Sequence, residues 1–198
     1  MKHSILNNEL KLRKPNFHKE CLERVLKEWF KIYTPLIELF KLQIRMNLRT
    51  KQLDLRTVKL TADPAMLDKA TLFIKAILIG YSPQDALIAL ENDSYLFSFF
   101  ITEVKFLRGD HLNRAIGRII GKNGNVKNTI EHVSKTKIRV IEDKVHILGG
   151  RSNVDVAKDA VCRLIMGAEP SKVQNKLRAL SSKLKERYGH IETVYKEF

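Results

Sequence analysis

The feature that most constrains the fold of this chain is an internal repeat. The stretch "DKATLFIKAILIGYSP" (68–83) has the same pattern as "DVAKDAVCRLIMGAEP" (155–170), 87 residues further along. Each begins with Asp, continues as an apolar helical stripe and ends in Gly-x-x-Pro. A glycine after such a stripe is typical of a helix C-cap, and the later proline is typical of the first position of a following helix. The shared pattern predicts two copies of one structural unit rather than a coincidental likeness.

The segments before each repeat predict the same order of elements. Two short strands with a tight connection are expected in 42–58 and again in 136–150. A pair of short helices is expected before each strand pair, at 19–31 with 35–40 and at 110–119 with 125–135.

A first strand completes each copy. In the second copy it is predicted at 99–106, where Phe100, Thr102, Val104 and Phe106 alternate onto one face. In the first copy the weaker candidate is "ELKLRK" (9–14). Each unit then has the order β-α-α-β-β-α, which places the chain in the α+β class.

The prediction divides the chain into four parts. They are a first unit at 1–82, a bridging helix and linker at 83–97, a second unit at 98–169, and a basic amphipathic helix with a tail at 170–198.

The charge of the chain favours a polyanionic partner. Its 198 residues include 36 Lys and Arg against 22 Asp and Glu, a formal net charge of +14. Such an excess is typical of proteins that bind nucleic acid or an anionic membrane face, although it also serves solubility. No apolar run approaches the roughly 18 residues of a membrane span, and the start has no signal-peptide core. We therefore expect a soluble intracellular protein, with nucleic acid as the leading partner and no membrane partner.

The stretch "RAIGRIIGKNGNVKNTIEHV" (114–133) predicts a phosphate site. A turn is expected at Gly121–Gly124, between two helices, because glycine takes positive φ and leaves backbone N–H groups open to an approaching ligand. The helix that follows directs its positive dipole end at the same place. The candidate binding residues are Arg114, Ile116, Gly117, Arg118, Ile119, Gly121, Lys122, Asn123, Gly124, Asn125 and Lys127.

Two other interpretations of these glycines are weaker. The first is a plain turn without a ligand, which the surrounding positive charge disfavours. The second is a nucleotide-binding P-loop, which needs four residues between its first Gly and the Gly-Lys pair, and then Ser or Thr. Here three residues separate Gly117 from Gly121, and Asn123 follows Lys122.

The first copy lacks this turn. No glycine precedes Gly80, and Lys31–Thr34 stands where the turn would be. A backbone clamp cannot form in the same way with such bulky residues, so this unit is expected to serve packing or protein contact. Trp29, with Phe30 and Tyr33, is either an exposed anchor for a partner or part of the core.

A further helix is expected from Ser171 to about Tyr188. Its apolar stripe holds Val173, Leu177, Leu180, Leu184 and Tyr188, and its basic stripe holds Lys172, Lys176, Lys183 and Arg187. The apolar stripe is expected to dock on the second unit. The basic stripe either adds phosphate contacts or is a solvated face, and Lys172 and Lys176 join the candidate binding residues.

Catalytic chemistry is not indicated. The six histidines have no metal-ligand spacing, and neither a Ser nucleophile elbow nor a carboxylate pair appears. We expect His132 and His146 at the surface or a sheet edge. Cys21 and Cys162 are expected to be buried free thiols. The sequence thus predicts no enzyme, no metal and no cofactor.

The second unit resembles the KH domain, whose GXXG loop clamps about four nucleotides of single-stranded backbone. The resemblance rests on "IGRIIGKNG" (116–124), "TIEHVSKTKIRV" (129–140) and "VHILG" (145–149). It implies two tandem type I KH units, the first degenerate, and it implies that the candidate residues bind RNA.

A longer match resembles the Pno/Dim family of small-subunit ribosome-assembly factors. It runs from about Lys27 to Tyr188 and includes "WFKIYTPLIE", "LQIRMNL", "RGDHLNRAIGRIIGKNG", "KVHILGG" and "PSKVQNKLRALSSKLKERY". The chain departs from the family at Asn123 and Asn125, where members commonly have Gly and Lys. It also lacks the long polar N-terminal extension of many eukaryotic members, which leaves both a compact eukaryote and an archaeal-type relative open.

The resemblance implies a non-enzymatic factor of ribosome biogenesis, in pre-40S rRNA processing. Such a factor binds the single-stranded 3′ region of the small-subunit rRNA precursor. There it meets the Nob endonuclease, the rRNA dimethyltransferase and small-subunit ribosomal proteins. We expect it in the nucleolus, nucleus and cytoplasm of a eukaryote, or in the cytoplasm of an archaeon. Two alternatives stay open: a related KH factor that acts earlier on the same precursor, and a protein-interaction scaffold.

Overall fold

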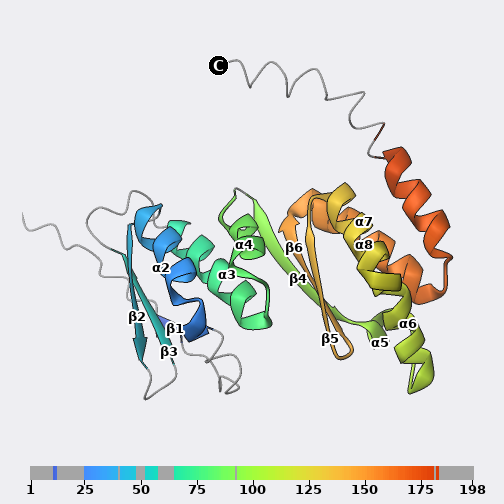
Figure 1. Ribbon diagram of the computed structural model, residues 1–198, viewed down its shortest axis with the longest axis horizontal. Coiled ribbons are helices and arrows are strands. Elements are labelled where there is room, and N and C mark those ends of the chain that lie inside the picture. The colour runs from blue at the N-terminus through green and yellow to red at the C-terminus, as the bar shows by residue number, and fades with distance from the viewer. Residues whose placement is uncertain are drawn as a thin grey trace, which may run out of the picture. The chain divides into compact units, whose positions relative to one another are not determined.

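The computed structural model describes residues 11–12, 25–39, 41–47, 52–57, 65–91, 93–180 and 182. The chain forms two compact units, Met1–Ser94 and Tyr95–Phe198, and each is described by itself (Figure 1).

The first unit contains an antiparallel sheet of three strands. These are β1 (Lys11–Leu12), β2 (Leu42–Asn47) and β3 (Gln52–Thr57), in the order β1-β3-β2. The strands predicted within 9–14 and 42–58 are confirmed. The helices α2 (Trp29–Glu38) and α3 (Ala65–Ile79) bury apolar residues with the inward face of the sheet. The most buried members of this core are Ile32, Leu36, Leu42, Leu55 and Phe73.

The end of α3 follows the repeat pattern. Gly80 has a φ of 110°, and its N–H donates to the Ala76 carbonyl over 3.2 Å, so it caps the helix as predicted. Pro83 begins α4 (Pro83–Ala86), and the Ser82 hydroxyl accepts a hydrogen bond from the Asp85 N–H at 3.1 Å. A 3₁₀ turn (Leu87–Leu90) follows, so the bridging helix predicted within 83–97 is one short α-helical turn continued by a 3₁₀ turn.

The predicted break at Lys31–Thr34 is wrong, because all four residues lie inside α2. The Ile32 N–H donates to the Glu28 carbonyl over 3.2 Å, and the Thr34 hydroxyl donates to the Phe30 carbonyl over 2.8 Å. The irregular residue is Glu28, with φ −106° and ψ 19°. Because this stretch has no glycine to adopt positive φ, the helix continues through it. Pro35 also lies inside the helix, which therefore lacks the hydrogen bond that an N–H at this position would donate.

The second unit repeats the topology. Its strands β4 (Ser94–Phe100), β5 (Lys137–Ile141) and β6 (Lys144–Gly150) form a sheet in the order β4-β6-β5. The helices α6 (Asp110–Ile120), α7 (Asn125–Ser134) and α8 (Arg151–Met166) cover one face of this sheet (Figure 1). The predicted order β-α-α-β-β-α is confirmed, with a short extra helix, α5 (Ile101–Val104), after β4.

The strand predicted at 99–106 is wrong in extent and in phase. β4 ends at Phe100, whose N–H donates to the Glu103 carboxylate over 3.3 Å and so favours the turn into α5. Phe99 and Ile101 are the buried residues, 5% and 0% exposed, whereas Phe106 is 72% exposed. The residues Phe100 to Phe106 therefore do not form one strand face, because Thr102 and Val104 lie in α5, where Val104 packs against the core.

The closing helix is confirmed over residues 170–180. Gly167 caps α8 with a φ of 111°, and Pro170 begins the next helix, as the repeat predicts. Val173 and Leu177 are buried in the core of the second unit, whereas Leu180 is 40% exposed. The remaining members of the two predicted stripes, Lys183, Leu184, Arg187 and Tyr188, lie outside the described residues.

His146 contradicts its predicted place at the surface or a sheet edge. It is 7% exposed on the central strand β6, and its Nδ1 lies 2.6 Å from the Ser98 hydroxyl. Burial, and secondarily the charge of Lys144, lower the pKa of this imidazole. His132 is exposed, as predicted.

Cys162 is a free thiol, but it is half-buried rather than buried, and burial raises its pKa. Cys21 lies outside the described residues. Within the described ranges no helix has the length and apolarity that a bilayer crossing requires, and no three side chains are grouped to hold a metal ion.

Candidate RNA-binding loop

The loop between α6 and α7 has a backbone that glycine makes possible. Gly121, Asn123 and Gly124 have φ values of 73°, 53° and 76°. A Cβ atom on Gly121 would lie 2.9 Å from the Val126 backbone nitrogen, so this position excludes side chains. At Gly124 the nearest atom to such a Cβ is 3.6 Å away, so there the positive φ alone favours glycine. The predicted turn is confirmed, and Asn123 joins it in the left-handed region.

Two backbone hydrogen bonds delimit the loop. The last bond of α6 runs from the Gly121 N–H to the Gly117 carbonyl over 2.8 Å, and the loop closes with a bond from the Gly124 N–H to the Gly121 carbonyl over 3.2 Å. Lys122 and Asn123 lie between these bonds and are both exposed. The N-terminus of α7 begins at the next residue, so its positive dipole end adds to the attraction for an anion.

Gly117 opens the face of α6 next to this loop. It lies inside the helix, it is exposed, and no atom stands within 4 Å of the place a Cβ would take. A glycine inside a helix costs about 0.5–1 kcal/mol relative to alanine, and packing gives no reason for it here. Ile116 is half-buried and Ile120 is 37% exposed, so apolar surface borders the open position. The arrangement admits close approach of a ligand backbone.

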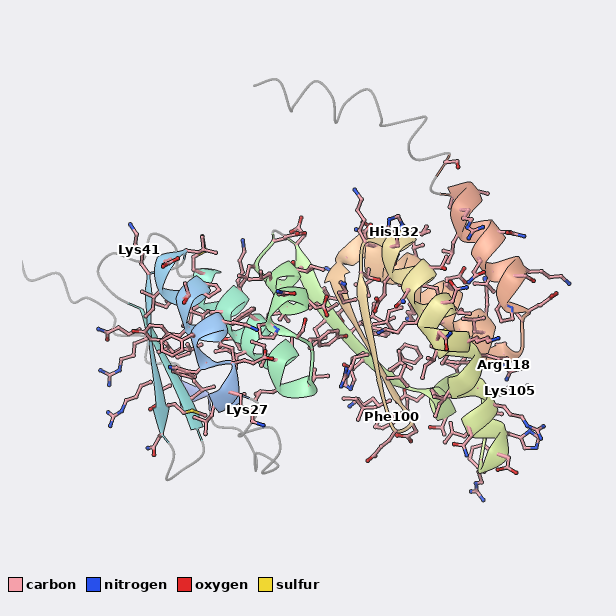
Figure 2. All side chains as sticks on the ribbon, in the orientation of Figure 1. Lys27, Lys41, Phe100, Lys105, Arg118 and His132 are labelled. Atoms are coloured by element: carbon pink, nitrogen blue, oxygen red, sulfur yellow. The ribbon has the colours of Figure 1, made fainter. Side chains whose placement is uncertain are left out.

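Two predicted contact residues pack within the second unit. Ile119 is fully buried in the core and cannot touch a ligand, since it lies on the opposite side of α6 from Gly117. Arg118 lies against the end of α8, with one guanidinium nitrogen 3.6 Å from where a Gly167 Cβ would stand (Figure 2). Its Nε is buried, without a hydrogen-bond partner among the described residues. A cation at a helix C-terminus is favourable.

The other predicted cations differ in how far they are neutralised. Lys122 and Arg114 are exposed. Lys127 lies 3.4 Å from the Glu131 carboxylate, which also accepts the Ile138 N–H at 2.7 Å. Because the Ile138 N–H holds Glu131 in place, this carboxylate partly neutralises Lys127.

The basic stripe of the closing helix meets acidic neighbours. Lys172 lies 3.7 Å from Glu169, and Lys176 lies 3.9 Å from Asp159. Both lysines are exposed, so these pairs are weak. The pair with Asp159 nevertheless places Lys176 next to α8 and not next to the loop Gly121–Gly124.

A different stripe of the same helix faces α7. Gln174 donates to the Thr129 hydroxyl over 3.4 Å, and one turn later Arg178 lines a shallow groove with Asn128 and His132 of α7. Arg178 was not among the residues predicted from the sequence. The signal was present, because Gln174, Arg178 and Ser182 recur every four residues and so share one face.

Comparisons with known proteins agree with this geometry. A model of the family described as "Eukaryotic type KH-domain (KH-domain type I)" matches residues 98–182. The RNA-binding protein PNO1 of Oryzias latipes is 48% identical over 165 residues, which cover 82% of this chain and 68% of that protein. The protein pno1 of Drosophila melanogaster is 46% identical over 177 residues, 89% and 74% of the two chains. The pre-rRNA-processing protein PNO1 of Saccharomyces cerevisiae is 48% identical, and the match spans 59% of its length.

Solved structures share the fold of the chain. Dim2p from Pyrococcus horikoshii is 26% identical with a TM-score of 0.71, over 86% of this chain and 98% of that one. A chain of the a/eIF2alpha–aDim2p–rRNA complex from the same organism is 25% identical with a TM-score of 0.74, over 91% and 98%.

The fold and the loop together define a protein of KH units, the first without the loop glycines. The chain belongs to the PNO1 family of RNA-binding, pre-rRNA-processing proteins. The predicted resemblance is thereby confirmed, and the names of the relatives describe RNA binding and processing rather than catalysis.

Proposed function

We propose that this chain is a non-enzymatic ribosome-assembly factor that holds single-stranded small-subunit rRNA precursor at the loop Gly121–Gly124. One observation carries the proposal: an exposed turn with three positive φ values stands at the N-terminus of α7. A turn of this kind binds phosphate without reading the sequence, because its donors are backbone N–H groups.

The neighbouring side chains extend the site in a defined way. Lys122 supplies a charge within the loop, Gly117 lets the RNA backbone approach α6, and Ile120 offers apolar surface to a base. The segment held would be about four nucleotides long, as is usual for this type of domain.

The finer role follows from family resemblance. We infer that the RNA is the 3′ region of the precursor, and that the chain assists its final processing beside a Nob-type endonuclease. The rRNA dimethyltransferase and small-subunit ribosomal proteins are the other expected partners. Nucleolus, nucleus and cytoplasm are the expected compartments in a eukaryote. The similar archaeal aDim2p chain was solved in a complex with rRNA, which supports an RNA partner of this class.

The test is a double variant, Lys122→Asp with Asn123→Asp, in the full chain. Affinity for single-stranded oligonucleotides tiled across the precursor 3′ region, measured by fluorescence anisotropy, should fall at least tenfold, about 1.4 kcal/mol. The fold should survive, because both side chains are exposed.

A matched control makes the same change in charge on the first unit. Lys75→Asp with Gln84→Asp alters two exposed helical residues there and should leave RNA affinity within about twofold of the unmodified chain. Equal losses in both double variants would mean that net charge, and not the loop, determines binding.

A further inference from the structure

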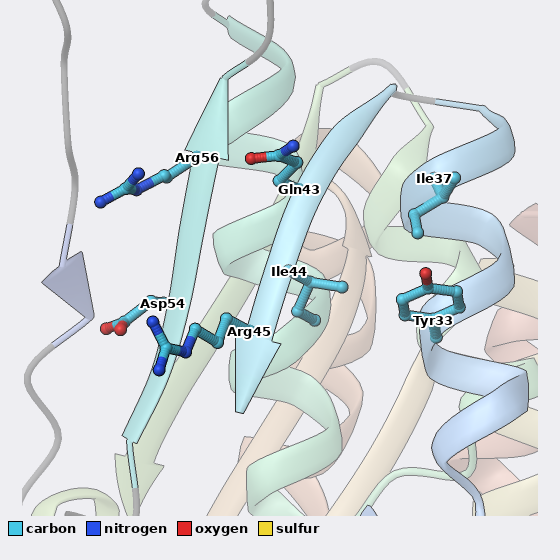
Figure 3. A pocket seen from close by; sticks show the side chains of 7 residues that line it. All are labelled: Tyr33, Ile37, Gln43, Ile44, Arg45, Asp54 and Arg56. Carbon is cyan, nitrogen blue, oxygen red and sulfur yellow. The ribbon is translucent and has the colours of Figure 1, made fainter. Parts of the chain in front are cut away.

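The first unit has a groove between α2 and the strand β2 (Figure 3). Tyr33 and Ile37 from α2 line one wall, and Gln43, Ile44 and Arg45 of β2 line the other. Its counterpart by topology in the second unit is the space beside α7 and β5, since each lies between a helix and the edge strand that follows it. In the first unit, however, α2 is a continuous helix and lacks the glycine turn that is proposed to hold a phosphate in the second unit.

The strand β2 offers an open edge. It pairs along its whole length with β3, from Leu42 opposite Thr57 to Asn47 opposite Gln52. Within the described residues no strand pairs with its other side, because β2 is the last strand in the order β1-β3-β2. An open edge of six residues presents backbone donors and acceptors to which another strand can add.

The two sides of this edge differ chemically. Figure 3 shows Ile44 directed toward Tyr33 and Ile37, whereas Gln43 and Arg45 point to the other face of the sheet. The apolar side continues along α2, where Phe30 is 81% exposed and Tyr33 is 38% exposed. Large apolar side chains exposed together on one helix are typical of a protein-binding surface.

The basic side adds charge. Arg45 is exposed on β2 itself, and Arg56, which lies opposite Gln43 in the register, is on the neighbouring strand β3. Asp54, which lies opposite Arg45, is the single acidic residue of the groove lining. Successive side chains of an added strand would alternate between the apolar wall and this basic face.

We propose that this groove binds an extended segment of a partner protein in which apolar and acidic residues alternate, added as a strand to the edge of β2. Backbone hydrogen bonds would give affinity, while Tyr33 with Ile37 and Arg45 would select the two kinds of side chain. This inference does not depend on the RNA loop of the second unit.

The test starts from random 12-residue peptides displayed on phage and selected on the immobilised full chain. Enriched peptides should alternate apolar and acidic residues, and a synthetic copy should shift the amide NMR signals of β2. Its affinity should fall at least tenfold in Arg45→Glu and in Tyr33→Ser. Lys75→Glu makes the same change in charge as Arg45→Glu on an exposed helical residue of the same unit, and should bind as the unmodified chain does.

Three results would overturn the proposal. The first is a selection that yields no common pattern, and the second is a set of selected peptides that shift signals outside α2 and β2. The third is that single-stranded RNA shifts the β2 signals and Arg45→Glu weakens RNA binding instead, which would make the groove a nucleic-acid site. The variant with Lys122→Asp and Asn123→Asp should keep its peptide affinity, so failure at the RNA loop and failure at this groove are distinguishable.

Discussion

In a Gly117→Ala variant, a methyl group is added to the exposed face of α6, and the structure predicts opposite effects on folding and on binding. No atom lies within 4 Å of the new Cβ, so the change creates no clash. Alanine inside a helix is favoured over glycine by about 0.5–1 kcal/mol, so the free energy of unfolding of the second unit should rise by that amount. For a domain of this size the melting temperature should rise by about 2–8 °C.

The same methyl group stands where the RNA backbone is proposed to approach. We expect at least a tenfold loss of affinity for single-stranded RNA, measured by fluorescence anisotropy beside thermal unfolding followed by circular dichroism. Ser152→Ala, at an exposed position in the first turn of α8, is a control that should leave RNA binding unchanged. Unchanged RNA affinity in a stabilised Gly117→Ala protein would refute the view that this glycine makes room for RNA.

Three further predictions follow from the same contacts. Gly121→Ala should lower the free energy of unfolding by about 2 kcal/mol or more in urea titrations, because its φ is 73° and its Cβ space is filled; full stability would contradict this. Burial and Lys144 lower the pKa of His146 below its usual value of 6.5 in the folded state. The free energy of unfolding should therefore decline as the pH falls from 6.5 toward the folded-state pKa, by up to about 1.4 kcal/mol per pH unit. The His146→Gln variant should lack this decline. Arg178→Gln should reduce the slope of log affinity against log salt by about 0.7, and Lys176→Gln, whose lysine is ion-paired, should reduce it by less. A larger change in Lys176→Gln than in Arg178→Gln would mean that RNA contacts the predicted basic stripe and not the face with Arg178.

Local chemistry that depends on one residue type was predictable from the sequence. Gly80 and Gly167 end their helices because the residue after a helix commonly adopts positive φ, which glycine does readily. Pro83 begins the next helix because its ring fixes φ near the helical value. The turn at Gly121–Gly124 followed from the same reasoning. The structure adds that a Cβ atom on Gly121 would clash with Val126, so only glycine fits there.

Features set by tertiary packing were not predictable. The alternation of Phe100, Thr102, Val104 and Phe106 was consistent with a strand, but the buried residues are Phe99 and Ile101, which only the neighbouring elements select. The place of His146 depended on β6 being the central strand, and the pairing of Lys176 with Asp159 depended on how the closing helix lies on α8. Periodicity predicts a face, but not the neighbour that the face will meet.

Ultraviolet crosslinking in cells, with the crosslinks mapped on both the protein and the RNA, tests whether the loop Gly121–Gly124 holds precursor rRNA. We expect crosslinked peptides within residues 116–128, joined to nucleotides in the 3′ region of the small-subunit precursor, and we expect these crosslinks to be lost in the Lys122→Asp, Asn123→Asp variant. Crosslinks confined to the first unit, or equally strong in that variant, would contradict this expectation.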